Sequence, residues 1–442
     1  MDNQTNVDQV VESAEKQVAP WMQTAIAALT SYIDAGSIVA GGLALAHFWK
    51  EKFGMNELDE GLIVAFSPNA FAAAIGALVG GMICDKLGRK FVYTYDLVLY
   101  IIGMLFVIFA PNFYVLFSAY MVVGLAVGAD VVASWTLIAE QAPAENRARH
   151  CGAAQLAWAI GPAVVFIIAY CVGTTSPMVH QIVLGHLVVV ALITWMLRLQ
   201  MPESKNWREA RDREKKMIAE GKIEKVRFST FLRGINLRTI LFLCGIYVIW
   251  NLCAGTMGFL LPTIHKEVCG LGEQASTALM ALLFSVSAFS TLFVFMSWGD
   301  RLSRRGIYCV IAFLFVVAWG IFLLPESVLK AYPILLMTLF SVLVGINNGS
   351  GQQAFYQLWC SELFPARYRA TAQGITFFAT RISCGIWTFT IPFFIAKDSF
   401  ATAALFMVFF ATFSMLVGTL FAPKTSGKTL QQIEKERYGD SA

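Results

Sequence analysis

Charged residues are scarce in this chain. Asp, Glu, Lys and Arg together make up 14% of its 442 residues, against about 25% in soluble domains. Residues 150–197, 239–265, 274–299, 331–361 and 399–423 contain no charged residue, and each stretch reaches the ~20 apolar residues that a helix needs to cross a bilayer. Together with a hydrophobic content of 57%, this scarcity excludes a soluble globular protein and indicates an integral membrane protein.

Motifs of catalysis and cofactor binding are also missing. The nine cysteines form no CxxC pair and lie mostly in apolar runs, which is typical of packing residues. His and Cys spacing shows no metal site, no glycine-rich loop is suited to phosphate, and no nucleophile–base set is visible. We therefore expect no metal, no cofactor and no enzyme activity, and the formal charge of +4 does not indicate nucleic-acid binding.

The apolar runs predict an all-α membrane protein with twelve transmembrane helices in two six-helix bundles, because backbone polar groups in lipid must be satisfied internally. The predicted domains are an N-terminal bundle (1–201), a cytoplasmic linker (202–237), a C-terminal bundle (238–422) and a cytoplasmic tail (423–442). The linker contains a helix-compatible run at 206–219. The predicted spans are 21–46, 61–84, 91–110, 113–139, 151–171, 179–201, 238–264, 274–298, 307–325, 331–360, 371–396 and 400–421.

Two charged strings occur twice, once in each half of the chain. Asp85-Lys-Leu-Gly-Arg-Lys90 returns as Asp300-Arg-Leu-Ser-Arg-Arg305, and Glu140-Gln-Ala-Pro-Ala-Glu-Asn-Arg147 returns as Glu362-Leu-Phe-Pro-Ala-Arg-Tyr-Arg369. All four strings lie between long apolar runs. The repeat indicates a duplicated gene that encodes two membrane halves of like topology, an architecture typical of secondary transporters.

Lysine and arginine are distributed unevenly over the predicted loops. Of the 33 such residues, Arg198 and Arg381 fall within spans, and the loops on one side hold only Lys50, Lys52, Lys266, Lys330 and Lys397. The remainder lie on the other side. Because positively charged loops stay cytoplasmic, we expect a multi-pass protein of the cell (inner or plasma) membrane with both termini in the cytoplasm. The polar first 20 residues indicate no signal peptide.

The repeated strings resemble the major facilitator superfamily. Gly81-x-x-x-Asp85-Lys-x-Gly-Arg89-Lys90 is similar to the motif between its helices 2 and 3. The two Glu-x-x-Pro-x-x-x-Arg strings, Pro202-Glu-Ser-Lys-Asn-Trp207 and the segment 423–433 resemble the sugar-porter and organic-ion-transporter branch. The resemblance implies alternating access with a cytoplasmic gate of acids and arginines that pair across the bundle: Asp85, Arg89, Glu140, Arg147, Asp300, Arg304, Glu362 and Arg369.

Two carboxylates inside spans are candidates for proton coupling, because a charge at the bilayer centre costs ~2.5–3.5 kcal/mol or more and is rarely idle. Asp34 lies near the middle of its span in a Tyr-x-Asp-x-Gly segment that resembles the proton-coupling helix 1 of sugar porters. Asp130 is expected to lie near Asp34. Tyr120 stands where sugar porters usually have an arginine on helix 4. Asp96 is interpreted as structural, as a helix cap or a partner of Arg89 or Lys90.

Arg381 is the strongly basic group deepest in a span, and its segment resembles helix 11 of organic-anion transporters. A guanidinium binds carboxylate or phosphate through two parallel hydrogen bonds, so we expect Arg381 to bind an anionic substrate. The alternatives are an ion pair with Asp34 or Asp130, or a structural arginine. Amides and aromatic residues suited to hydroxyl-rich ligands complete the expected binding site: Asn348, Gln352, Gln353, Tyr356, Asn251, Gln155, Trp158 and Trp387.

These observations predict a secondary active transporter that takes up a small polar metabolite with a proton. A sugar acid or other organic anion is favoured over a neutral sugar or polyol. A proton-driven exporter is an alternative, since Gly161-Pro162 partly resembles an antiporter motif, and a transport-dead nutrient sensor is disfavoured by the short tail. Twelve spans can enclose one pathway, so we expect a monomer whose partners are the substrate, the proton and the lipid bilayer.

Overall fold

In the computed structural model of the chain, residues 19–173, 176, 178–221, 226, 228–396 and 400–439 are described, and every regular element among them is helical. The N-terminal half contains α2 (Pro20–Ala44), α3 (Lys50–Phe53), α4 (Glu57–Ala65), α5 (Phe71–Leu87), α6 (Arg89–Ile108), α7 (Phe113–Gln141), α8 (Arg147–Val172) and α9 (Val179–Arg198). A short helix, α10 (Lys205–Ala219), follows in the linker.

The C-terminal half repeats this order of long helices. It contains α11 (Gly234–Glu267), α12 (Glu273–Ser290), α13 (Met296–Trp298), α14 (Arg304–Gly320), α15 (Glu326–Ala331), α16 (Pro333–Ser350), α17 (Gln352–Leu363), α18 (Arg369–Ala396) and α19 (Phe400–Phe421). The tail forms α20 (Leu430–Tyr438). Ten helical segments of the described residues are long and apolar enough to cross a membrane. With α5 and α18 they make up the twelve expected spans.

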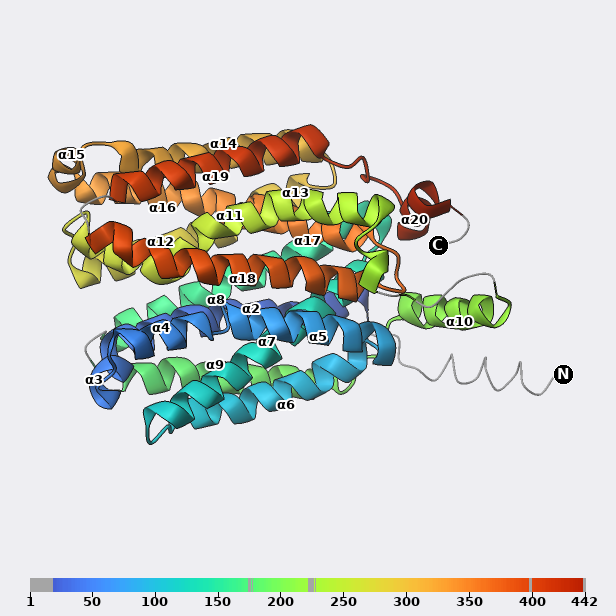
Figure 1. Cartoon of the computed structure of the whole chain (residues 1–442), viewed down its shortest axis with the longest axis horizontal. Coiled ribbons are helices and arrows are strands. Elements are labelled where there is room, and N and C mark those ends of the chain that lie inside the picture. The colour runs from blue at the N-terminus through green and yellow to red at the C-terminus, as the bar shows by residue number, and fades with distance from the viewer. Residues whose placement is uncertain are drawn as a thin grey trace.

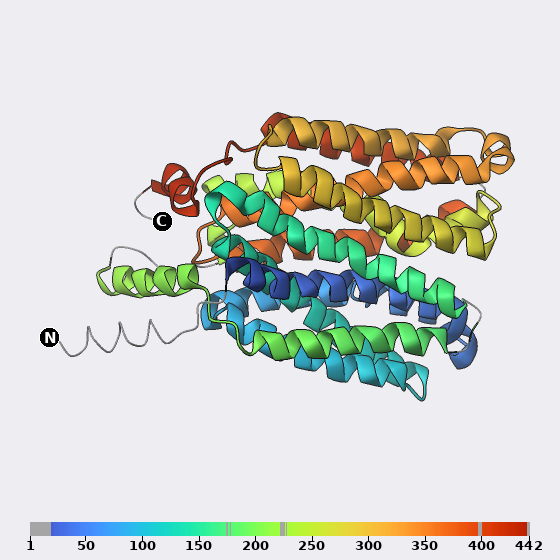
Figure 2. The same cartoon turned by 180° about the vertical axis from the view of Figure 1, so that it is seen from behind.

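The long helices run side by side, and the two halves form two adjoining bundles (Figure 1). Helices α10 and α20 both lie beyond one end of the bundles, which we call the linker end (Figures 1 and 2). Across the boundary between the halves, α5 packs against α18 and α8 packs against α12. This boundary is where a site shared by the two halves has to lie.

Two predicted spans are interrupted by residues that belong to no helix. The span expected at 61–84 consists of α4 and α5 with a break between them, because Pro68 lacks a backbone N–H and disfavours the helical conformation at Ser67. The span expected at 331–360 consists of α16 and α17, which are separated at Gly351. A Cβ at Gly351 would lie 2.5 Å from the Asn347 carbonyl oxygen, so glycine is required there.

Candidate functional site

A small cavity lies between the two halves and is lined by both. The N-terminal half contributes residues of α2, α8 and the α4–α5 break, and the C-terminal half contributes residues of α11, α12, α17 and α18. Its volume of about 30 Å³ holds a few water molecules and is too small for a sugar-sized ligand. The polar and aromatic lining residues are Asn69, Trp158, Trp250, Asn251, Phe284, Gln353 and Arg381.

Asp34 and Arg381 meet beside this cavity from opposite halves: Arg381 lines it, and Asp34 directly precedes the lining residue Ala35. The Asp34 Oδ2 atom of α2 lies 4.0 Å from the Arg381 Nη2 atom of α18, and both residues are at least 95% buried. Arg381 Nη1 donates a 2.6 Å hydrogen bond to the Asn69 side-chain oxygen, and its guanidinium lies 4.7 Å from the centre of the Phe377 ring. The alternative interpretation of Arg381, an ion pair with Asp34 across the cavity, is therefore the arrangement observed.

The Asp34 carboxylate is otherwise poorly satisfied. Neither of its oxygens accepts a hydrogen bond of normal geometry from the described residues, although the Trp158 indole lies close. A buried charge with so few partners is costly unless its charge is compensated. The charge of Asp34 therefore depends on Arg381, a residue of the other half.

Four of the nine residues expected to bind substrate line the cavity. They are Arg381, Gln353, Asn251 and Trp158. Their side chains come from α18, α17, α11 and α8; with Asn69 and Trp250, the cavity lining combines one guanidinium, three amides and two indoles from both halves. These groups donate and accept hydrogen bonds and offer an apolar face, which suits a small hydroxylated ring.

Three other expected residues connect helices near the cavity. Gln155 of α8 donates a 2.6 Å hydrogen bond to the Asn348 carbonyl oxygen of α16, and the Asn348 amide donates to Ser287 at 3.3 Å. The Gln352 side-chain oxygen accepts a 2.7 Å hydrogen bond from Asn347. In this conformation the three side chains join helices, and none of them lines the cavity.

Tyr356 and Trp387 do not line the cavity. The Tyr356 hydroxyl is 2.7 Å from the Thr376 hydroxyl, and its ring stacks on Tyr247 with centroids 3.9 Å apart. Trp387 packs against Phe410 of α19, with the two ring centroids 5.1 Å apart. The geometry therefore does not support a substrate contact for Trp387, because α18 presents this side chain to α19.

Asp130, expected beside Asp34, has a different main partner. Arg198, near the C-terminal end of α9, donates a 2.7 Å hydrogen bond to Asp130 Oδ1 and lies 3.8 Å from Asp96. Asp96 is thus not a partner of Arg89 or Lys90, since its carboxylate faces the interior of the N-terminal bundle. Tyr120, in place of the arginine of sugar porters, is buried, and its hydroxyl donates to the Ser37 carbonyl oxygen at 3.4 Å.

All eight residues of the expected gate come together at the linker end, in two equivalent sets. In one set, Glu140 accepts from Arg89 of its own half at 2.7 Å and from Arg369 of the other half at 2.9 Å. In the other set, Glu362 accepts from Arg304 of its own half at 3.0 Å and from Arg147 of the other half at 3.0 Å. Each glutamate therefore binds one arginine from each half.

The two aspartates of the repeated strings hold helix ends across the same boundary. Asp85 accepts from the backbone N–H of Thr371 at 2.7 Å, in the first turn of α18. Asp300 accepts from the N–H groups of Ala148 and Arg149 at 3.0 Å each, in the first turn of α8. A carboxylate at a helix N-terminus is stabilised by the unsatisfied N–H groups and the helix dipole. The linker end is thus closed by paired charges and by helix capping.

Sequence reasoning missed Asn69 and gave Arg198 no role. Asn69 lies within a run that reads as one apolar span, and the signal that marks it is the adjoining Ser67-Pro68, which breaks the helix. Arg198 lies near a predicted span end, where a long side chain is expected to reach the interface; here it turns inward to Asp130. The close packing of α8 on α2 requires a glycine at Gly161 of the Gly161-Pro162 pair, since a Cβ there would lie 2.4 Å from the Tyr32 carbonyl oxygen of α2.

Comparison with known proteins gives consistent matches over almost the whole chain. The family model of the Major Facilitator Superfamily matches residues 24–388. The minor myo-inositol transporter IolF of Bacillus subtilis (strain 168) is 45% identical, with 94% of each chain covered. The major myo-inositol transporter IolT of the same strain is 26% identical, with 87% of each chain covered.

Among solved structures, the proton:xylose symporter XylE bound to 6-bromo-6-deoxy-D-glucose superposes with a TM-score of 0.76 at 16% identity. The match covers 95% of this chain and 99% of that chain. At this level of identity the likeness concerns the fold, and it confirms the arrangement of twelve helices in two bundles.

Proposed function

The chain belongs to the major facilitator superfamily, and on that premise we propose that it imports a neutral cyclic polyol, with myo-inositol as the first candidate, together with a proton. The protein is a transporter and not an enzyme. The observation that carries the proposal is the meeting of Asp34 and Arg381, one from each half, beside the central cavity that Arg381 lines.

Two findings favour a neutral polyol over the anion expected from the sequence. The relative that shares 45% of its residues with this chain is named a myo-inositol transporter. In addition, the charge of Arg381 is balanced by Asp34, and Asn69 already accepts one of its N–H groups. A cavity without net charge that is lined by amides and indoles favours hydroxyl groups over a carboxylate.

Asp34 is the proposed proton acceptor. When its carboxylate binds a proton, the ion pair between α2 and α18 is lost, and the attraction that held the two halves together at the cavity weakens. Proton binding and the relative position of the halves are thereby linked, as coupling requires. Inward movement of each net positive charge is driven by ~2.3 kcal/mol per 100 mV of membrane potential.

The gate residues are proposed to act at the cytoplasmic side. If the linker end faces the cytoplasm, as the excess of Lys and Arg predicts, the two Glu–Arg sets close the inner exit in this conformation. Substrate and proton then enter from outside, the sets at Glu140 and Glu362 separate as the halves rock, and both are released inward. One chain contains the whole pathway, so we propose a monomer in the cell membrane with both termini inside.

A specific observation supports an anionic substrate as the second candidate. The Nε atom of Arg381 is buried and has no hydrogen-bond partner in the described residues. Once Asp34 is protonated, the guanidinium is no longer balanced by a carboxylate and could bind a sugar acid or another organic anion. The two candidates differ in which protonation state of Asp34 accepts the ligand.

The test is uptake of labelled myo-inositol into proteoliposomes with an imposed proton gradient. We expect accumulation with the wild type, and loss of accumulation but persistence of exchange with Asp34→Asn. The matched control is Asp59→Asn, because Asp59 lies in the first turn of α4, outside the cavity. Unchanged accumulation by Asp34→Asn would refute the coupling role. Stronger competition by a sugar acid than by inositol would select the second candidate.

A further inference from the structure

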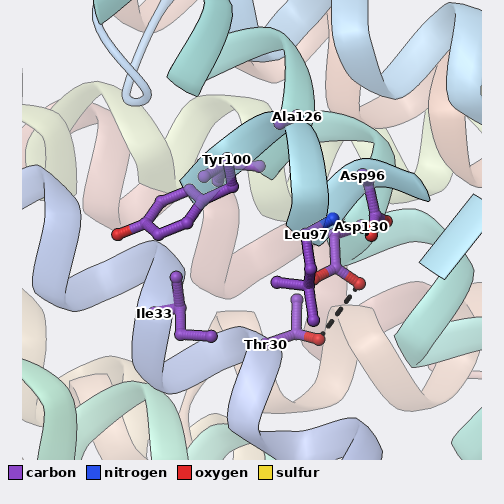
Figure 3. A pocket seen from close by; sticks show the side chains of 8 residues that line it. Thr30, Ile33, Asp96, Leu97, Tyr100, Ala126 and Asp130 are labelled. Carbon is purple, nitrogen blue, oxygen red and sulfur yellow. Dashed lines mark hydrogen bonds between the residues drawn. The ribbon is translucent and has the colours of Figure 1, made fainter. Parts of the chain in front are cut away.

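A second cluster of buried charges lies inside the N-terminal bundle, apart from the central cavity. Its members come from four helices: Thr30 of α2, Asp96 of α6, Asp130 of α7 and Arg198 of α9. Figure 3 shows Thr30 donating to Asp130, at 3.1 Å, with Asp96 close by. None of these four residues lines the cavity between the halves.

The donors of the cluster converge on Asp130. Its Oδ1 atom accepts from Arg198 at 2.7 Å, from Ser134 at 2.9 Å and from Thr30 at 3.1 Å. Arg198 also donates to the hydroxyls of Thr30 and Ser134 and, at 3.2 Å, to the Tyr93 carbonyl oxygen. The guanidinium is thus occupied mainly by Asp130 and its neighbours.

Asp96 accepts fewer hydrogen bonds than Asp130. Its Oδ1 atom accepts from the adjacent Leu97 N–H at 2.5 Å and lies 3.8 Å from Arg198. Its Oδ2 atom is buried and has no hydrogen-bond partner in the described residues, and the residue as a whole is 93% buried. An unpartnered carboxylate oxygen at such burial is costly when the group is ionised.

The charges do not balance. Two carboxylates share one guanidinium, and among the described residues Arg198 is the one cation that they contact. The other described groups around the cluster supply no positive charge: the Tyr93 ring lies against Arg198, the Tyr100 hydroxyl is hydrogen-bonded to Ser37, and Asp34 on the next turn of α2 is itself acidic. One further positive charge would make the cluster neutral.

We propose that Asp96 and Asp130 together bind one proton, and that with Arg198 they form a second proton-binding site distinct from Asp34. The proton comes from water and bonds to a carboxylate oxygen, and Asp96 Oδ2 is the oxygen free to take it. The cluster then carries one negative and one positive charge. A cavity of about 10 Å³ bounded by Thr30, Asp96, Tyr100 and Asp130 (Figure 3) is at the lower limit for one water molecule, which could deliver the proton.

A proton fits this site better than a metal cation. A sodium ion between the two carboxylates would be held close to the guanidinium that already binds Asp130 at 2.7 Å, and the like charges would repel. A sodium ion also needs several oxygen ligands, whereas the oxygens of Thr30, Ser134 and Asp130 already bind one another.

The position of the site suggests how it serves transport. Thr30 precedes Asp34 by one turn of α2, ~6 Å along the axis, on the side where α2 begins. A proton leaving Asp34 toward that end of the helix passes the level of Asp130. This role as a station for the outgoing proton rests on the proposed function, whereas proton binding by Asp96 and Asp130 does not.

Infrared difference spectroscopy of the purified protein in lipid tests the binding directly. Spectra recorded at acidic minus alkaline pH show the carbonyl stretch of each carboxyl that takes up a proton. The background is Asp34→Asn, so that Asp34 does not contribute. When Asp96→Asn is added to this background, we expect the spectrum to lose the band area of one carboxyl. When Asp96→Glu is added instead, we expect the band to keep its area and to shift in frequency. Asp59→Asn, a control at a partly exposed capping residue of α4, should leave the buried-carboxyl region unchanged.

Asp130→Asn provides an independent variant. Because the two carboxylates share the proton, the loss of the Asp130 carboxylate should also remove the band area of one carboxyl. If Asp96→Asn does not fold, this variant decides the question. An unchanged band area in both variants would overturn the proposal. A failure of myo-inositol uptake would leave these spectra unaffected, so the failure of the transport proposal and that of the proton site are distinguishable.

Discussion

Arg381 is held at the cavity by two side chains of the opposite half. Asn69 accepts its Nη1–H at 2.6 Å, and Asp34 lies 4.0 Å from its Nη2 atom. Asn69 lies in the break between α4 and α5, next to Pro68, and its backbone is therefore not part of either helix. A local irregularity in the N-terminal half therefore positions the charge of the C-terminal half.

We predict that Asn69→Ala weakens substrate binding by about 10-fold or more, because a hydrogen bond to a charged group contributes roughly 1.5–3 kcal/mol. The measurement is the half-saturating substrate concentration for exchange in proteoliposomes, where no proton gradient is needed. The control is Asn112→Ala, which removes an exposed cap of α7 outside the cavity and should leave this concentration unchanged. Equal effects of the two changes would contradict the role of Asn69.

At the residue level the sequence indicated the charges and left their partners open. Asp34 and Arg381 were identified because charge inside a span is expensive, and the structure brings them together. Asp130 was expected near Asp34, and the groups that donate hydrogen bonds to its carboxylate, which were not predicted, belong to Arg198, Ser134 and Thr30. The rotation of each helix about its axis decides such pairings, and the pattern of apolar residues in a buried helix does not fix it, because nearly every face is apolar.

At the level of helices, the contact between α5 and α18 depends on glycine. A Cβ at Gly374 of α18 would lie 2.5 Å from the Ala77 carbonyl oxygen, and a Cβ at Gly81 of α5 would lie 2.5 Å from the Ala370 carbonyl oxygen. Both clashes are with backbone atoms, which cannot move aside as a flexible side chain can. Small residues let helix backbones approach closely in membranes, and here the two helices belong to different halves.

We predict that Gly374→Val separates α5 from α18 and lowers the transport rate at least 10-fold, while the protein still inserts and folds. The two halves can no longer close fully at the linker end, so the buried thiol of Cys84 on α5 should react faster with a polar maleimide. Peptide-resolved mass spectrometry measures this rate. The control is Gly185→Val on α9, where a Cβ meets nothing within 4 Å. Normal transport by Gly374→Val would show that the close approach is dispensable.

The sequence predicted the helices well and their interruptions poorly. The linker helix expected at 206–219 is present as Lys205–Ala219. It could be predicted because its charged residues favour the helical conformation and set it apart from the apolar spans. The breaks at Pro68 and Gly351 were not predicted, since a single proline or glycine within a long apolar run is tolerated in many membrane helices. Asn69 of the first break lines the cavity, as does Gln353, which lies close to Gly351 in the chain.

For the molecule as a whole, closure of the linker end rests on the Glu140 and Glu362 sets. The two glutamates and their four arginines are at least 93% buried. Exposed ion pairs contribute roughly 0–1 kcal/mol, but removal of one partner of a buried pair costs ~3–5 kcal/mol. The sets can therefore decide which end of the transporter is open.

We predict that Glu140→Gln and Glu362→Gln each shift the population toward the conformer that is open at the linker end, and to a similar extent. Each change removes the carboxylate that two arginines share, and Arg89 and Arg304 keep only their aspartates, Asp85 at 3.1 Å and Asp300 at 3.2 Å. The expected result is faster labelling of the buried Cys84 and Cys151, measured peptide by peptide. Glu51→Gln, in the exposed helix α3 at the other end, serves as control. Unchanged labelling in both variants would contradict the gating role.

The global architecture was the part most accessible from sequence. Twelve spans in two bundles and the superfamily follow from hydrophobic runs and repeated charged strings, and they are confirmed. The conformation, closed at the linker end around a small cavity, was not predictable. Conformers of a transporter differ by only a few kcal/mol, a difference spread over many contacts that the sequence does not display.

Because each glutamate of the linker end binds an arginine from its own copy of the duplication and another from the opposite copy, the two copies cannot evolve independently. A mutation that weakens one set will tilt the equilibrium of the entire carrier. Genetic suppressors of a Glu140 change should consequently arise in the opposite copy, near Glu362 or in the first turns of α8 and α18, as readily as beside the original lesion.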